Sequence, residues 1–163
     1  MSRRNETKNM IKKIITSLFF ILLFSNSIYA QGQGFGLGMI LGEPTGISFK
    51  NWLGRSTAVD FAIAWFFEGK NSLTIHGDYL SHHFKLIQVE SGSLPFYYGI
   101  GGSIKFKDDD TRLGARVPLG LNYHFENLTL DLFLEFVPVL LLIPKTDFDI
   151  NVGIGIRYFF TRK

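Results

Sequence analysis

The chain has 163 residues, with 17 Lys and Arg against 14 Asp and Glu, and it contains no cysteine. A disulfide framework and thiol chemistry are therefore excluded. The basic excess lies near the N-terminus, because residues 31–163 hold 12 basic and 13 acidic side chains, a net charge of −1. This balance gives no electrostatic reason to expect nucleic acid as a partner.

Residues 1–30 have the pattern of a secretory signal peptide. Five basic side chains precede an apolar run of eleven residues, 14–24, which is too short for a bilayer-spanning helix of about 20 residues. The segment 25–30 then supplies a cleavage site after Ala30. We therefore expect a cleaved signal peptide over 1–30 and one mature domain over 31–163, with an uncleaved membrane anchor as the alternative.

Eight candidate strands follow, separated by short segments rich in Gly, Pro, Asn and Asp. We expect them at 35–41, 47–53, 57–67, 72–84, 96–107, 113–125, 130–142 and 148–160. No apolar pattern with the period of a helix runs for a useful length. Links this short join antiparallel neighbours, because a parallel crossover needs a dozen or more residues.

The last strand shows the alternation most clearly. Its two faces separate large apolar residues from polar or small ones, because successive side chains of a strand point to opposite sides. One face holds Phe148, Ile150, Val152, Ile154, Ile156, Tyr158 and Phe160, and the other holds Asp149, Asn151, Gly153, Gly155 and Arg157. The other strands repeat the pattern, as where Val59 and Phe61 alternate with Asp60 and Ala62.

The apolar faces are predicted to point outward. If they pointed inward, glycines such as Gly99 and Gly153 would form the solvent surface, and bulky side chains from eight strands would overfill a narrow interior. Outward apolar groups and an interior of Gly and short polar residues are typical of a transmembrane β-barrel. Several strands also run 11–13 residues, enough for a tilted crossing. Closure would pair every backbone amide, as lipid requires.

The predicted fold class is thus all-β: an eight-stranded antiparallel up-and-down transmembrane β-barrel, preceded by a cleaved signal peptide. Several segments carry a resemblance to a known group, and they cover nearly the whole mature chain: 34–38, 41–46, 98–102, 116–121, 135–139 and 153–159. With them the chain resembles the small outer-membrane barrels of the OmpX/OmpA type, and within these a family of single-domain barrels without an assigned activity.

The resemblance implies a place in the outer membrane, with outer-membrane lipid and the barrel-assembly machinery as partners and a monomeric state. Such barrels serve as adhesins, immune-evasion factors, small channels or envelope components. The first interpretation is a structural barrel that presents loops to host or environmental macromolecules. The alternative is a narrow pore or a lipid A-modifying enzyme.

The predicted interior holds the one dense polar group of the chain. Its members face inward by the alternation: Lys50, Asp60, His76, Asp78, Lys105, Arg116, Asn122, His124, Asp131, Glu135, Asp149, Asn151 and Arg157. Buried charges must be paired, so the first interpretation is a network of ion pairs that plugs the barrel. The alternative is a narrow ion path or gate. Within the network we expect Glu135 to accept hydrogen bonds from Arg116 or Arg157.

Catalytic and metal-binding patterns are weak, and we expect no enzyme, cofactor or metal. Some outer-membrane barrels are lipid A deacylases or acyltransferases, and His76 and Asp78 share one face here, but such a pair arises readily by chance. His82 and His83 point opposite ways on a strand and cannot share an ion.

The predicted topology places both mature termini in the periplasm, because an even strand number puts both ends on one side. The segments 42–46, 68–71, 108–112 and 143–147 would then lie outside the cell.

Overall fold

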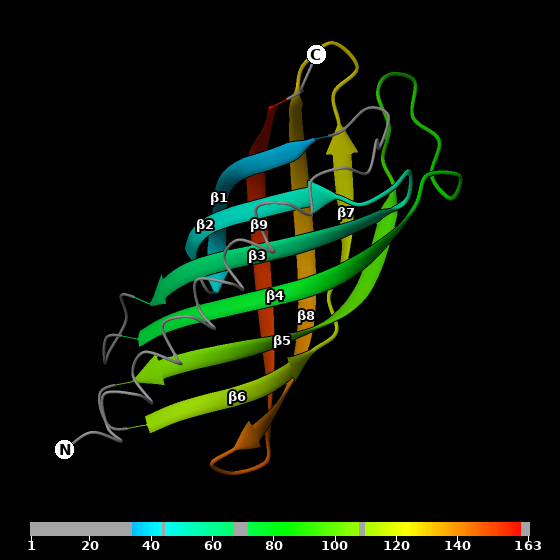
Figure 1. Ribbon diagram of the computed structural model, residues 1–163. Coiled ribbons are helices and arrows are strands. Elements are labelled where there is room, and N and C mark those ends of the chain that lie inside the picture. The colour runs from blue at the N-terminus through cyan, green and yellow to red at the C-terminus, as the bar shows by residue number, and fades with distance from the viewer. Residues whose placement is uncertain (1–33, 44, 67–71, 108–109, 161–163) are drawn as a thin grey trace, which may run out of the picture.

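The computed structural model describes residues 34–43, 45–66, 72–107 and 110–160, and in these residues every regular element is a strand (Figure 1). The strands are β1 Phe35–Glu43, β2 Thr45–Trp52, β3 Thr57–Phe66, β4 Ser72–His83, β5 Phe96–Lys107, β6 Asp110–Arg116, β7 Leu119–His124, β8 Leu130–Ile143 and β9 Asp147–Phe160. Among these residues there is no helix long and apolar enough to cross a membrane.

The strands form one antiparallel sheet that closes on itself. Each strand from β1 to β5 pairs with the next, and β8 pairs with β9. The last strand, β9, pairs with the whole length of β1, from Phe35 opposite Phe160 to Glu43 opposite Val152. In Figure 1 the strands β1 to β6 lean across the front and β7, β8 and β9 cross behind them. The predicted barrel closure is thereby confirmed.

The strand expected at 113–125 is divided into β6 and β7, which together fill one position in the ring. Both segments lie between β5 and β8, and the register on each side is the same before and after the break. The break falls at Pro118, which has no N–H to donate. The ladder continues through it, because Val117 N donates to Pro138 O at 3.0 Å and Gly99 N donates to Pro118 O at 2.9 Å. Nine segments therefore make an eight-position barrel.

The pairing also fixes the tilt of the strands. Following partners around the ring from Gly36 leads through Lys50, Asp60, Asp78, Gly101, Arg116 and Val139 to Asp149. Gly36 is paired directly with Phe159, so the two routes reach β9 ten residues apart. With about 3.3 Å per residue and about 4.8 Å between strands, this stagger over eight positions gives a tilt of about 40° and a barrel radius of about 8 Å.

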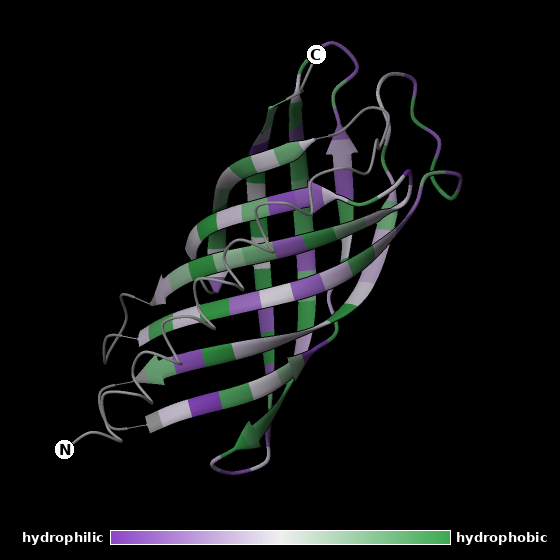
Figure 2. Ribbon diagram, in the orientation of Figure 1, coloured by the Kyte–Doolittle hydropathy of each residue, from purple (hydrophilic) through white to green (hydrophobic). Residues whose placement is uncertain are grey.

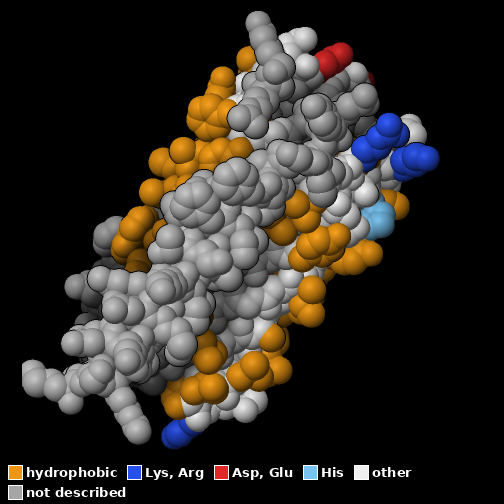
Figure 3. Space-filling model, in the orientation of Figure 1, with side chains coloured by type: hydrophobic (Ala, Val, Ile, Leu, Met, Phe, Trp, Pro, Cys, Tyr) orange, Lys and Arg blue, Asp and Glu red, His pale blue; other side chains and the backbone are white. Residues whose placement is uncertain are grey.

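The two faces of the sheet separate as the alternation predicts. Inward residues of β8 such as Asp131 and Phe133 are buried, whereas outward residues such as Leu134 and Phe136 are 52% and 44% exposed. Figure 2 shows the result as alternating hydrophilic and hydrophobic bands along the strands. On the face drawn in Figure 3, hydrophobic side chains cover the sides of the barrel and the charged ones lie towards its ends. The outer surface therefore suits lipid.

The two ends of the barrel are built differently. We call the end with Phe35 and Phe160 the terminal end, and the end with the β1–β2 and β8–β9 turns the hairpin end. At the hairpin end Gly42 has a φ of 139°, and its carbonyl accepts a hydrogen bond of 2.9 Å from Thr45 Oγ1. The longest described connection, 84–95, lies at the terminal end.

Some predicted boundaries were wrong at the hairpin end. The segments 42–46 and 108–112 were expected to be loops, but β1 runs to Glu43, β2 starts at Thr45 and β6 starts at Asp110. Paired backbone groups carry these strands further than the turn-forming residues suggested. The expected loop 68–71, residues 1–33 and residues 108–109 fall outside the described part of the chain.

Candidate functional site

The thirteen residues predicted for the interior do not all share one environment. Ten are buried, with 9% exposure or less: Lys50, Asp60, His76, Asp78, Arg116, Asn122, His124, Asp131, Glu135 and Arg157. Lys105 and Asn151 are half-buried. Asp149 is exposed and its carboxylate accepts a hydrogen bond from Ile150 N, so its predicted place in the buried network is wrong.

The length of β1 explains the exposure of Asp149. Pairing between β1 and β9 ends at Glu43 and Val152, so Asp149 has a neighbouring strand on the β8 side alone. The alternation on β9 continues there, but among the described residues no neighbouring strand remains on the β1 side to help bury the carboxylate.

Arg157 is the centre of the first of two ion-pair clusters. Its guanidinium binds Asp60 through Nη1 and Asp131 through Nε at 3.2 Å, and Nη1 also donates to Ser48 Oγ at 3.4 Å. The ring of Phe133 lies under the guanidinium, 3.8 Å from the guanidinium carbon. One arginine thus connects β2, β3 and β8 to β9 across the lumen, and it forms ion pairs with two carboxylates.

Arg116 is the centre of the second cluster. Its Nε donates to Asp78 Oδ1 at 3.1 Å, and its Nη2 lies 3.5 Å from Glu135 Oε1. Glu135 also accepts a hydrogen bond of 2.9 Å from the hydroxyl of Tyr97. The predicted contact of Glu135 with an arginine is confirmed as an ion pair with Arg116, whereas Arg157 binds other carboxylates.

Two glycines make room for this second cluster. A Cβ at Gly101 would lie 1.9 Å from Asp78 Oδ1, and a Cβ at Gly120 would lie 2.4 Å from Cζ of Tyr97. Asp78 and Tyr97 therefore reach Arg116 and Glu135 across backbone that carries no side chain. Here the glycines act by allowing close approach of their neighbours.

Lys50 lies outside both clusters and has an aromatic environment. Its Nζ is 2.8 Å from Nε2 of His82, whose Nδ1 lies 3.3 Å from the carbonyl of Ser56. The carbonyl accepts a hydrogen bond from Nδ1–H, so Nε2 carries the lone pair that accepts a hydrogen bond from the ammonium of Lys50. The rings of Trp52 and Tyr97 lie 4.8 Å and 5.3 Å from Nζ, within the range of cation–π attraction.

Aromatic side chains pack together in the lumen at the terminal end. Trp52 and Phe159 are buried there and Phe84 packs against them. The Trp52 ring lies 4.4 Å from His82 and 5.7 Å from His124, which is on the opposite wall. Charged groups in the middle of the barrel are thus covered by aromatic rings on this side.

Four of the residues that take part were missed by the sequence reasoning: Ser48, Trp52, His82 and Tyr97. Their positions in the alternation place each of them inward. Tyr97 was missed because it lies between Phe96 and Tyr98 in what reads as an aromatic girdle, and a serine or histidine at a strand position does not stand out without its partners.

The histidines and carboxylates considered for a catalytic pair or a metal site are engaged elsewhere or lie on opposite faces of β4. Asp78 and His76 both face the lumen, but the carboxylate of Asp78 binds Arg116. His82 is buried and His83 is exposed, on opposite faces of β4. No group of three or more His, Cys, Asp and Glu within the described ranges is arranged to hold a metal ion.

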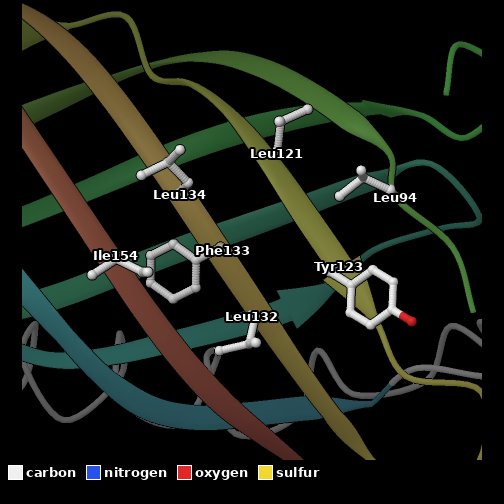
Figure 4. A pocket seen from close by; sticks show the side chains of 7 residues that line it. All are labelled: Leu94, Leu121, Tyr123, Leu132, Phe133, Leu134 and Ile154. Atoms are coloured by element: carbon white, nitrogen blue, oxygen red, sulfur yellow. The ribbon is translucent and has the colours of Figure 1, made fainter. Parts of the chain in front are cut away.

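A separate feature lies on the outer wall, where Figure 4 shows seven side chains around a shallow apolar depression. Its volume is about 220 Å³, and it is lined by Leu94, Leu121, Tyr123, Leu132, Phe133, Leu134 and Ile154. These residues come from β7, β8, β9 and the connection before β5. Phe133 is buried on the lumen side of β8, whereas the other strand residues of the depression lie on the outer face, and no ion-pair group of the lumen lines it.

Comparison with solved structures supports the same fold. The N-terminal β-barrel domain of Pseudomonas aeruginosa OprF matches with a TM-score of 0.56 and 14% identity, over 80% of this chain and all of that one. A de novo designed transmembrane β-barrel matches with a TM-score of 0.51 and 16% identity, over 80% of this chain and 99% of that one. No family model matches the chain, and no curated protein matches it. The chain therefore has the fold of a small transmembrane β-barrel of the OmpA type.

Proposed function

We propose that the protein is a monomeric outer-membrane β-barrel whose lumen is plugged by ion pairs and whose role in the envelope is structural. The observation that carries the proposal is the division between the faces. The outer face exposes side chains such as Ile154 at 55% and Leu132 at 39%, while Arg116 and Arg157 lie at 1% in the lumen. This is the reverse of a soluble barrel, which would bury its apolar face.

The size of the barrel supports a plug. A backbone radius of about 8 Å leaves an interior that side chains can fill. Here Arg157 reaches Asp60 and Asp131 on different walls, and Arg116 likewise reaches Asp78 and Glu135. The two arginines therefore obstruct the middle of the lumen, and Trp52 and its neighbours obstruct the terminal end. Such an interior favours rigidity over conduction.

In the proposed orientation, the terminal end faces the periplasm and the hairpin end faces outward, as in bacterial barrels generally. The outward turns are short where they are described, since three residues separate β8 from β9. Contact with host or environmental macromolecules would then use these turns, with outer-membrane lipid and the assembly machinery as the other partners. An epitope tag inserted between Asp109 and Asp110 should be labelled on intact cells. Labelling restricted to lysed cells would reverse the orientation.

The plugged lumen is tested by reconstitution into planar bilayers. The purified mature chain should insert and migrate as a folded barrel on unheated gels, yet give no ion current above that of the empty bilayer. Steady single-channel steps from folded protein would instead support the narrow pore, with the half-buried Lys105 and Asn151 lining its wider part. A lipid A mass spectrum unchanged by expression of the protein is expected, and a change would support the enzyme.

A further inference from the structure

Three exposed side chains with nitrogen donors lie together on the outside of the barrel at the terminal end: Arg55, His83 and Lys85. The backbone places Arg55 beside the end of β4, because His82 N donates to Ser56 O at 2.7 Å and the antiparallel register then puts residue 55 next to residue 83. Lys85 follows His83 by two residues, where the chain leaves β4. We call Arg55, His83 and Lys85 the basic patch.

The basic patch lies at the level of the bilayer interface. The ring of His83 stacks on the ring of Tyr98, with 5.2 Å between the centroids and 15° between the planes. Tyr98 is 46% exposed on the outer face, and Tyr158 is 49% exposed near the same end of β9. Outward aromatic residues of this kind mark the depth of the lipid headgroups. Arg55 and Lys85 lie just beyond the strand ends, so they extend the patch from this depth towards the water.

The two basic side chains of the patch are not neutralised by a described residue. Neither Arg55 nor Lys85 forms an ion pair or a side-chain hydrogen bond with one. Glu90 precedes Ser91, whose hydroxyl donates to Glu126 at 2.9 Å, so the carboxylates at this end lie on the β7 side. On the face drawn in Figure 3, Lys, Arg and His side chains gather near the terminal end, apart from the acidic ones.

The position and the charge of the patch together indicate its partner. Ammonium and guanidinium groups only donate hydrogen bonds, and phosphate oxygens are strong acceptors for them. Leu53, which precedes Arg55 in the same turn, is exposed and apolar, so the patch borders the lipid-facing surface. Residues 31–163 carry a net charge of −1, so attraction to an anionic bilayer has to come from a local group of basic residues and not from the whole protein.

We propose that the basic patch binds the headgroup of an anionic phospholipid in the leaflet at the terminal end. Arg55 and Lys85 pair with the headgroup phosphate, and His83, held in place by Tyr98, donates a third hydrogen bond. The proposal rests on the membrane-spanning barrel of the proposed function and adds a preference for one class of lipid. A basic side chain close to an anionic bilayer surface favours binding about fivefold at low salt.

The test measures which lipid lies beside the patch. Val59 faces outward on β3, four residues and about 13 Å of strand from Arg55, and a single cysteine there carries a fluorophore. The mature chain is placed in mixed vesicles of phosphatidylcholine and phosphatidylglycerol, in which one of the two lipids has brominated acyl chains. At low salt, brominated phosphatidylglycerol should quench as if it were enriched about fivefold or more beside the label. Equal quenching by the two brominated lipids at equal mole fraction would overturn the proposal.

Charge variants separate the patch from other sources of lipid preference. Replacing both Arg55→Gln and Lys85→Gln should lower the enrichment at the Val59 label to about one, because both charges are then gone. Lys145→Gln is the matched control, since Lys145 is equally exposed but lies in the β8–β9 turn at the hairpin end, and it should leave the enrichment unchanged. Enrichment retained in the double variant would refute the assigned residues.

A second label distinguishes failure of this proposal from failure of the proposed function. A fluorophore on Leu132→Cys lies on the outer face of β8, across the ring from β3, and should show no enrichment of phosphatidylglycerol. Equal enrichment at both labels would contradict a local binding surface. Quenching by neither lipid at either label would refute the membrane-spanning barrel itself, and the lipid preference with it.

Discussion

Replacement of Arg157 by methionine is the sharpest perturbation of the buried network. Methionine keeps much of the length of the side chain and its packing on Phe133, but it removes the charge. Asp60 and Asp131 would each lose their ion-pair partner, and Asp131 has no exposed surface through which water could replace it. Lys50 is opposite Asp60 in the register of β2 and β3, and although its Nζ contacts His82, its positive charge would compensate that carboxylate in part.

We expect Arg157→Met to lower the free energy of unfolding by about 3–5 kcal/mol, the cost of leaving a buried charge without its partner. The double variant Arg157→Met with Asp131→Asn should recover at least about 1 kcal/mol of the free energy of unfolding, because it has one fewer buried charge without a partner. Arg55→Met is the control: Arg55 is exposed in the 53–56 turn, and its replacement should change stability by at most about 0.5 kcal/mol.

The assay is urea unfolding in micelles, followed by tryptophan fluorescence. Trp52 lies in the lumen and Trp65 on the outer face, so the fluorescence reports on the unfolding of both faces of the sheet. If Arg157→Met were as stable as Arg55→Met, the ion pairs would contribute nothing to stability and the reasoning would be wrong. Loss of stability without any recovery in the double variant would place the effect in packing and not in charge.

The remaining predictions use the same assay or the planar bilayer. Leu132→Arg and Ile154→Arg should each cost about 2–4 kcal/mol near the bilayer midplane, and folding of both as well as the parent would show that the assigned face is wrong. Gly120→Val should displace Tyr97 and destabilise the barrel by about 1–3 kcal/mol, whereas an unchanged midpoint would argue against the close approach there. Glu135→Ala should lower stability and leave conductance at zero, since Arg116 keeps Asp78, and a new current would contradict the plug.

The alternation was enough to predict most of the fold, because one rule assigns each strand residue to a face. It placed Asp131 and Glu135 inward and Leu132 and Leu134 outward, as the burial confirms. The break at Pro118 was not predicted, although proline lacks the donor that a ladder needs. The register with β8 is the same before and after Pro118, so the alternation of inward and outward residues continues through 113–125 and does not reveal the break.

The sequence predicted which face of the sheet each side chain lies on, but not which charged side chains form ion pairs with each other. Arg116 and Arg157 were equal candidates for Glu135, since both lie on strands beside β8. The choice depends on the stagger of the barrel, which the sequence does not show: in the register Asp131 is directly opposite Arg157, and Arg116 is opposite Val139. The predicted burial of Asp149 was wrong for a similar reason, because the sequence does not show where β1 stops pairing with β9.

The most direct test of the central claim is lipid accessibility along β3, one residue at a time. The chain has no native cysteine, so each single-cysteine variant over 58–64 can carry one fluorophore. In vesicles whose acyl chains carry bromine, a label at Val59, Phe61 or Ile63 should be strongly quenched and a label at Ala62 should not, in a period of two residues. Equal quenching at every position, or quenching that is strongest at Ala62, would contradict a lipid-facing apolar surface around a sealed polar lumen.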